Sequence, residues 1–461
     1  MKAPKAVDTP YEQPRIFGAA YRAATIGILL VVTLVAFEGM SVGVVMPQVS
    51  KQLDALDLYG LSFSAFLIAS LFANVVSGLW ADRRGYTMPF LLGVVLFVLG
   101  MGLAGAAVNK ELFLAARAVQ GLGAGCTIVA IYVMIARVYP ADVRPRVFAA
   151  LSAAWVVPAM VGPAVAGFVA DTWGWRWVFY GIIPLVLPAL VMLVPALKRR
   201  PSQEAAPSEG PRSRPVAMTL AALAAAGGAG VLLWGVDGLH DEPARSAVAV
   251  VAGLAALGYG LRKLLPPGAL RFGAGLPTTI MLRGFFSAAF FGVNGFIPLV
   301  LEEVKEFDPR LAGIALTTGA LGWSTGSYLQ SRRSAEPYRR IRTGAACVMA
   351  GVLLSLLSVL PGVTGWVAVP AWIVAGFGMG LGMTTVSVTA LKQSPVNEQG
   401  ANSAALSVTD MLGSALAFGV GGALINLIGH SPSEIARGFE VIGGLMALVA
   451  FAAMLLARRA R

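Results

Sequence analysis

Three ionisable side chains interrupt long apolar stretches of this chain: Glu38, Arg117 and Asp410. A charge at the centre of a membrane helix costs at least about 2.5–3.5 kcal/mol on insertion scales, so such a side chain usually faces a partner or a cavity. Burial favours the protonated form of a carboxyl group, and a nearby guanidinium favours the charged form. Movement of Arg117 relative to Glu38 would therefore make Glu38 bind or release a proton. We expect Asp410 to be a second proton site or to neutralise a cationic substrate.

The depths of Glu38 and Arg117 in the membrane allow their side chains to meet. At about 1.5 Å per residue, Arg117 lies about 10 Å and Glu38 about 15 Å from the outer ends of their apolar stretches, and Asp410 lies near mid-bilayer. The alternative is a buried ion pair that only fixes helix packing. The sequence holds no phosphate-binding loop and no catalytic or metal-binding signature. We therefore expect no enzyme, no metal and no cofactor, with a proton gradient as the driving force.

Composition places these residues in a polytopic membrane protein. The 461 residues are 57% hydrophobic and 13% charged, and the mean hydropathy is +0.76. A soluble domain carries roughly 25% charged residues, so this chain lacks the charge to coat a soluble surface. Its apolar content also excludes intrinsic disorder.

Apolar stretches long enough to cross about 30 Å of hydrocarbon predict fourteen helical spans. Basic residues cluster in the loops on one side, which predicts that both termini are cytoplasmic and explains the net charge of +12 without nucleic acid. Anionic membrane lipids are the partners that this basic side implies. The predicted spans are 23–48, 60–81, 86–107, 111–137, 146–170, 175–197, 215–236, 245–265, 277–301, 309–331, 341–361, 366–391, 400–428 and 437–457.

An internal repeat divides these spans. The segment from Gly121 to Ser152 aligns without gaps with Gly376 to Ser407, an offset of 255 (376 minus 121). Parallel repeats of this kind place a substrate site between two halves near the midplane. The predicted organisation is an N-terminal tail (1–22), a six-helix bundle (23–197), a linker (198–214), two additional helices (215–265), a second six-helix bundle (277–457) and a C-terminal tail (458–461).

Several local motifs fall on these spans in a recognisable order. Gly78, Asp82, Arg83 and Gly85 follow the pattern G-x-x-x-D-R-x-G after the second span. Arg117 and Gln120 begin R-x-x-Q-G-x-G in the fourth. The fifth span carries Pro158, Gly162, Pro163 and Gly167, close to G-x-x-x-G-P-x-x-G-G with Pro158 and Ala166 replacing glycines. Trp175 to Phe179 reads W-R-W-x-F before the sixth.

Together these motifs resemble the major facilitator superfamily, and more narrowly its fourteen-helix drug:proton antiporter branch. The resemblance implies alternating access of two six-helix halves in the plasma (inner) membrane and proton-coupled export of amphipathic or cationic small molecules. It implies a proton-transfer role for Arg117 and places Asp82 and Arg83 at a cytoplasmic gate. The motif around Gly162 and Pro163 is associated with exporters.

Candidate residues for lining the substrate cavity are Gln120, Trp155 and Asn294. Two alternatives to multidrug export stay open, namely a dedicated transporter of a single metabolite, lipid or siderophore, and a non-transporting membrane scaffold. The predicted spans hold only two carboxylates, which is few for a pump that exports many different polycations. A monomer is the expected state.

Overall fold

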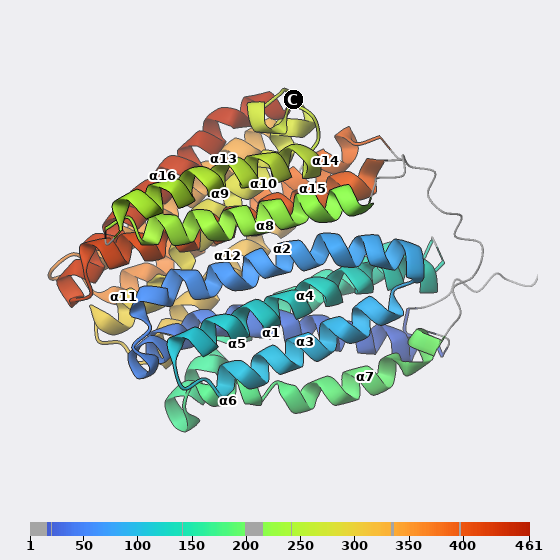
Figure 1. Ribbon diagram of the computed structural model, residues 1–461, viewed down its shortest axis with the longest axis horizontal. Coiled ribbons are helices and arrows are strands. Elements are labelled where there is room, and N and C mark those ends of the chain that lie inside the picture. Colours follow the sequence, from blue (N-terminus) through green and yellow to red (C-terminus); the bar gives the residue numbers. More distant parts are fainter. Residues whose placement is uncertain are drawn as a thin grey trace, which may run out of the picture.

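The computed structural model describes residues 16–19, 21–140, 142–198, 215–240, 242–332, 336–395 and 398–461. Within these ranges the chain forms α-helices joined by short turns and 3-10 segments, and no strand (Figure 1). Nearly all of the predicted linker 198–214, and most of the predicted tail 1–22, lie outside the described residues. The all-α fold class predicted from the sequence is confirmed.

The first half of the chain crosses the molecule six times and the second half does the same, with two further helices between them. The described helices are α1 (Arg22–Leu53), α2 (Tyr59–Arg84), α3 (Thr87–Gly105), α4 (Lys110–Val138), α5 (Arg144–Trp173), α6 (Arg176–Tyr180), α7 (Ile183–Lys198), α8 (Pro215–Asp237), α9 (Pro243–Leu264), α10 (Leu276–Asn294), α11 (Ile297–Glu303), α12 (Pro309–Arg332), α13 (Pro337–Ser355), α14 (Ala368–Gln393), α15 (Gln399–Ile428) and α16 (Pro432–Leu456).

Thirteen described segments are long and apolar enough to cross a membrane. The additional predicted span is α12, which has 24 residues but is rich in Gly, Ser and Thr. Thr317 and Thr318 donate hydrogen bonds to carbonyls of their own helix, at 3.0 and 2.7 Å. These small residues suit α12, because it packs along α14 and α5.

Two of the predicted spans are interrupted rather than continuous. The sixth divides into α6 and α7, and the ninth divides into α10 and α11. Gly295 lies between α10 and α11 in close contact with the ring of Phe418, and Pro298 occupies the first turn of α11. A glycine at a close approach followed by a proline in a first turn favours a new helix start over continuation.

The repeat is visible in the helices. α5 and α15 have the same length and differ by 255 residues at both ends (399 minus 144 and 428 minus 173). Gly121 lies against the backbone of α2, and its counterpart Gly376 lies against the backbone of α12. An added Cβ would collide with a main-chain carbonyl at either position, so both repeats need glycine there for close helix packing.

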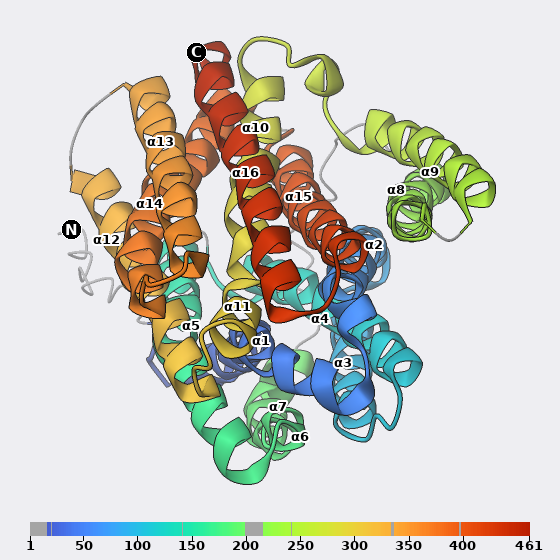
Figure 2. The ribbon, with the colours of Figure 1, turned by 90° about the vertical axis from the view of Figure 1, so that its left-hand side faces the viewer.

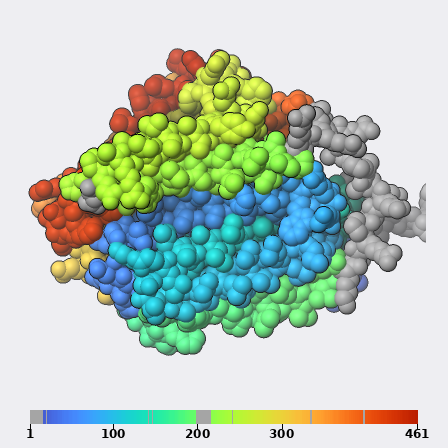
Figure 3. Space-filling view, in the orientation of Figure 1, coloured from blue at the N-terminus to red at the C-terminus, as the bar shows by residue number. Residues whose placement is uncertain are grey.

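Helices α8 and α9 pack along each other and cover the boundary between the two halves (Figures 2 and 3). α8 contacts α2 of the first half and α15 of the second. Leu233 of α8 lies against Gly419, and the Asn426 side-chain amide donates to Asp237 of α8 and to the Asp57 carbonyl, both at 2.7 Å. The added helices therefore bridge the halves on this side.

The packed core shows which end of the molecule is closed. We call the end that carries residues 54–58 and 304–308 the outer end, and the end that carries the C-terminus the inner end, following the orientation that the basic residues predict. One apolar cluster joins the outer part of the first half (residues 42 to 71, 104 to 116 and 166 to 179) to the second half. Toward the inner end, the first half has a separate cluster of its own, formed by residues 24 to 196. The halves are joined at the outer end.

Candidate functional site

Glu38 of α1 and Arg117 of α4 form an ion pair that is sealed from solvent. The Arg117 Nη1 lies 2.5 Å from Glu38 Oε1, and the two residues are 2% and 1% exposed. The same Nη1 donates to Gln120 Oε1 at 2.5 Å, and the guanidinium lies 4.6 Å from the centre of the Phe66 ring. The sequence-based expectation that Glu38 and Arg117 can meet agrees with this geometry.

Part of this buried group is left without hydrogen bonds. Glu38 Oε2, Ser41 Oγ and Gln120 Nε2 are buried and make no hydrogen bond with any described residue. Buried polar atoms are normally paired, and exceptions often mark a functional site. Arg117 thus pairs with one oxygen of Glu38, while the second oxygen has no hydrogen-bond partner among the described residues.

Asp410 of α15 forms a second ion pair, with Arg283 of α10. Nη2 and Nε of Arg283 donate to Asp410 Oδ2 at 2.8 and 3.1 Å. Arg283 Nη1 donates to the Ser387 hydroxyl at 2.7 Å, and the Ser287 hydroxyl donates to Asp410 Oδ1. The Arg283 and Asp410 side chains are 24% and 26% exposed.

Arg283 is a site residue that the sequence-based prediction did not include. It lies seven residues inside α10 and within the predicted span 277–301. The signal that could have found it is the one that found Arg117, namely a basic residue inside an apolar stretch. Its position near one end of the span made it resemble a loop residue.

Tyr132 of α4 lies across from this second pair. Its phenol is within electrostatic reach of both Arg283 and Asp410, although it belongs to the other half. Tyr132 is 42% exposed and its ring centroid lies 5.9 Å from that of Phe148 in α5. The Arg283–Asp410 pair therefore lies near the boundary between the two halves.

The exporter-type motif of α5 packs against α12 at the outer end. Gly167 lies against the Pro309 carbonyl, and Gly313 lies against the Pro163 carbonyl. Gly162 faces Phe37 and Met40 of α1 at ordinary contact distance. Pro158 and Pro163 lie inside the continuous α5. This motif thus forms the closed seam between the halves.

Ion pairs and hydrogen bonds also join the two halves at the outer end. Lys51 pairs with Glu303 at 2.8 Å, and Asp171 pairs with Arg310. Tyr59 donates to the Gly295 carbonyl and Ser64 donates to the Ala415 carbonyl, both at 2.7 Å. Each of these four contacts joins a residue of the first half to one of the second.

The G-x-x-x-D-R-x-G motif lies at the inner end of α2. Gly78 faces Val129 of α4, and Gly85 ends the helix with a φ of +86°, where a side chain would be strained. Asp82 and Arg83 are exposed, and neither forms an ion pair with a described residue. The inner end is therefore not clamped by this motif in the present conformation.

The three candidate cavity residues occupy different surroundings. Gln120 is fully buried against Arg117, and so it does not line an accessible surface here. Asn294 accepts a hydrogen bond from the Trp372 indole at 2.9 Å. Trp155 is partly buried against the inner core of the first half. None of them contacts the Arg283–Asp410 pair through a hydrogen bond between described residues.

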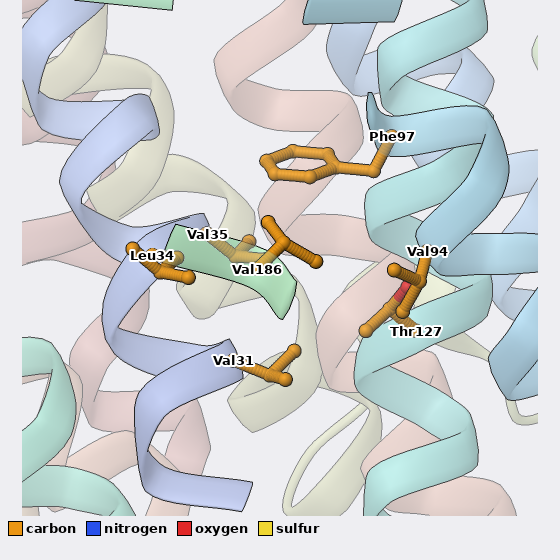
Figure 4. A pocket seen from close by; sticks show the side chains of 7 residues that line it. All are labelled: Val31, Leu34, Val35, Val94, Phe97, Thr127 and Val186. Carbon is orange, nitrogen blue, oxygen red and sulfur yellow. The ribbon is translucent and has the colours of Figure 1, made fainter. Parts of the chain in front are cut away.

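A small pocket inside the first half is apolar (Figure 4). Its only polar side chain is Thr127, whose hydroxyl donates to the Gly123 carbonyl at 2.8 Å. The pocket lies within one half rather than between the two, and it offers no group that could orient a substrate. It is lined by Val31, Leu34, Val35, Val94, Phe97, Thr127 and Val186.

Two repeated six-helix halves, joined at one end and carrying charged pairs within the spans, define a polytopic membrane protein with a transporter architecture. Solved structures share this fold. The bacterial homologue of the human lysosomal transporter Spinster, in an inward-facing and unoccupied conformation, matches with a TM-score of 0.66 and 16% identity, over 96% of this chain and 98% of that one.

The chain belongs to the Major Facilitator Superfamily, whose family model matches residues 28–418. It is 24% identical to the multidrug transporter protein MdtP of Bacillus subtilis over 81% of this chain and 69% of that protein. It is 26% identical to a probable multidrug-efflux transporter of Mycobacterium tuberculosis, over 85% of each chain.

Proposed function

We propose that this protein exports amphipathic small molecules in exchange for protons, by alternating access in the plasma membrane. The observation that carries the proposal is the sealed Glu38–Arg117 pair, whose second carboxylate oxygen has no hydrogen-bond partner among the described residues. The multidrug transporters to which the chain is similar support export of this substrate class.

Glu38 is the principal proton site in this mechanism, and Arg117 is its counter-charge. When the two side chains are in contact, the carboxylate is neutralised by the guanidinium. When a helix movement separates them, the buried carboxylate loses its partner and takes up a proton, because an unpaired charge in a low-dielectric interior is costly. Asp410 is the second acid of the proposal.

The closed outer end fits one stage of the cycle. Substrate reaches the surface between the halves from the inner end, which the basic residues predict to be cytoplasmic. Opening the outer end requires separation of Lys51 from Glu303 and of α5 from α12. Asp82 and Arg83 would then form the cytoplasmic gate, as the halves close at the inner end.

The test is proton release from the purified full-length protein when lipophilic compounds are added, measured with a pH indicator in weakly buffered detergent solution. The panel contains cationic, neutral and anionic aromatic compounds. We expect release from the wild type with at least one class and no release from Glu38→Gln. Glu242→Gln is the matched control, because it makes the same change on a 60% exposed side chain.

Export coupled to protons is contradicted if no class releases protons from the wild type, or if Glu38→Gln releases as many as the control. Release with one metabolite alone, and with none of the panel, would favour a dedicated transporter on the same fold.

A further inference from the structure

The cation of the Arg283–Asp410 pair has unused hydrogen-bonding capacity. A guanidinium carries five N–H donors. Three of them are engaged by described residues, two with Asp410 Oδ2 and one with the Ser387 hydroxyl. Two donors therefore remain, on a side chain that is 24% exposed.

The hydrogen-bond acceptor sites of Asp410 are more fully used. A carboxylate offers about four lone-pair sites. Asp410 accepts two bonds from Arg283 on Oδ2 and one from Ser287 on Oδ1, so three sites are filled. A cationic ligand would have to displace Arg283 to reach the charge of Asp410. An anionic ligand can add to the free donors of Arg283, and a guanidinium suits a planar, two-oxygen anion.

An aromatic side chain of the other half lies near this cation. Tyr132 lies within electrostatic reach of Arg283, and its ring contacts that of Phe148. The 42% exposure of Tyr132 gives a ligand body an aromatic face to pack on. One half thus supplies a charged contact and the other an aromatic contact.

Basic side chains at the inner end also favour the binding of an anion, through their long-range electrostatic field. Its loops and helix ends carry exposed basic side chains, including Arg83, Arg84, Arg332, Lys392 and Arg458. Whatever their role in membrane insertion, their summed field raises the local concentration of anions at the entrance to the surface between the halves.

We propose that Arg283 is the anion-binding residue of the substrate site, and that the exported compounds are amphipathic aromatic molecules with one carboxylate. This proposal rests on the proposed export function and names its substrate class. The carboxylate binds the free N–H donors of Arg283, and the aromatic body packs on Tyr132. Asp410 competes with the ligand for the same guanidinium.

The experiment measures equilibrium binding of tritiated 1-naphthylacetate to the purified full-length protein in detergent, without any gradient. Unlabelled 1-naphthylacetate, 1-naphthylacetamide and 1-naphthylmethylammonium compete for it, and these share one ring system but differ in charge. A hydrogen-bonded charge contact corresponds to about tenfold or more in affinity. We therefore expect the acetate to compete about tenfold better than the amide and the ammonium compound.

Variants then assign the preference to Arg283. Arg283→Gln should weaken acetate binding by about tenfold and leave amide binding unchanged. Arg283→Lys keeps the charge but loses the planar fork, so it should weaken the acetate to an intermediate extent. Asp410→Asn removes the competitor and should leave acetate binding equal or tighter. Should Arg283→Gln fail to fold, Arg283→Lys and Asp410→Asn carry the test.

Three results would overturn the proposal: equal competition by all three compounds, stronger competition by the ammonium compound, or loss of acetate binding in Asp410→Asn. The binding assay involves no proton movement. A protein that prefers the acetate but releases no protons would therefore contradict the proposed coupling alone, whereas proton release with cations only would contradict the anion site alone.

Discussion

The two ion pairs within the spans have opposite surroundings. Glu38 and Arg117 are at most 2% exposed and lie toward the closed outer end, whereas Arg283 and Asp410 are about one quarter exposed and lie near the boundary between the two halves. Arg117 packs on Phe66 of its own half. Arg283 has Tyr132 of the other half within electrostatic reach.

This difference separates two tasks that a coupled transporter must perform. A sealed pair responds to helix movement, because any separation leaves a buried charge without a partner. An exposed pair responds to a ligand, because water or a bound molecule can replace one partner at small cost. Under the proposed function, the first half serves coupling and the second half serves recognition of substrate, although the two halves share one repeated pattern.

The repeat explains where this division comes from. At the offset of 255 that α5 and α15 keep, Asp410 aligns with Trp155 (410 minus 255). The acid of the second pair therefore stands where the first half has an aromatic residue. The glycine contacts of α4 and α14 are kept in both halves, so the scaffold is repeated while the chemistry is not.

The largest expected effect is on stability when the sealed pair is broken. Glu38→Gln leaves the Arg117 guanidinium buried without a counter-charge, which costs about 3–5 kcal/mol when one partner of a buried pair is removed. Asp410→Asn, on the partly exposed pair, should cost less, because water can reach the Arg283 guanidinium that is left behind. Thermal unfolding of the purified variants in one detergent compares them directly.

A variant that removes both charges of the sealed pair tests whether the loss of stability comes from the unpaired charge. Glu38→Gln with Arg117→Gln removes both buried charges and should recover much of the stability lost in Glu38→Gln alone. Equal losses for Glu38→Gln and Asp410→Asn would mean that the two pairs do not differ in the way their exposure indicates.

A smaller effect is expected at the seam that closes the outer end. Gly167→Ala places a methyl group against the Pro309 carbonyl, at 2.6 Å, and a backbone atom cannot move aside cheaply. Overpacking of this kind costs about 1–3 kcal/mol and should shift the protein toward an open outer end. Labelling of a cysteine introduced at Ala170, which is 3% exposed near the outer end of α5, should become faster.

Gly102→Ala is the matched control, because nothing lies within 4 Å of its added Cβ. It should be neutral or slightly stabilising, as alanine is the better helix former. Faster labelling in both variants would point to general loosening rather than to opening of the α5–α12 seam.

Sequence reasoning could predict the elements and one of the two pairs. Fourteen apolar stretches, the repeat and the buried Glu38 and Arg117 all follow from residue types and spacing. The sequence alone could not place Arg283 beside Asp410, because 127 residues separate them and only packing of α10 on α15 brings them together. The same holds for the contact of Gly167 with α12, since a motif within one helix does not identify the neighbouring helix.

The smallest expected effect concerns the exposed ion pair that links the halves at the outer end. The Lys51 side chain is 67% exposed and its partner Glu303 is 19% exposed, so Lys51→Ala should cost no more than about 1 kcal/mol. The loss should shrink further at high salt, because an exposed pair is screened, whereas the cost of Glu38→Gln should hardly change with salt. Thermal unfolding of both variants at low and high salt measures this. If salt alters the cost of Glu38→Gln as much as that of Lys51→Ala, ions reach the Glu38–Arg117 pair, and the contrast between a sealed and an exposed pair no longer holds.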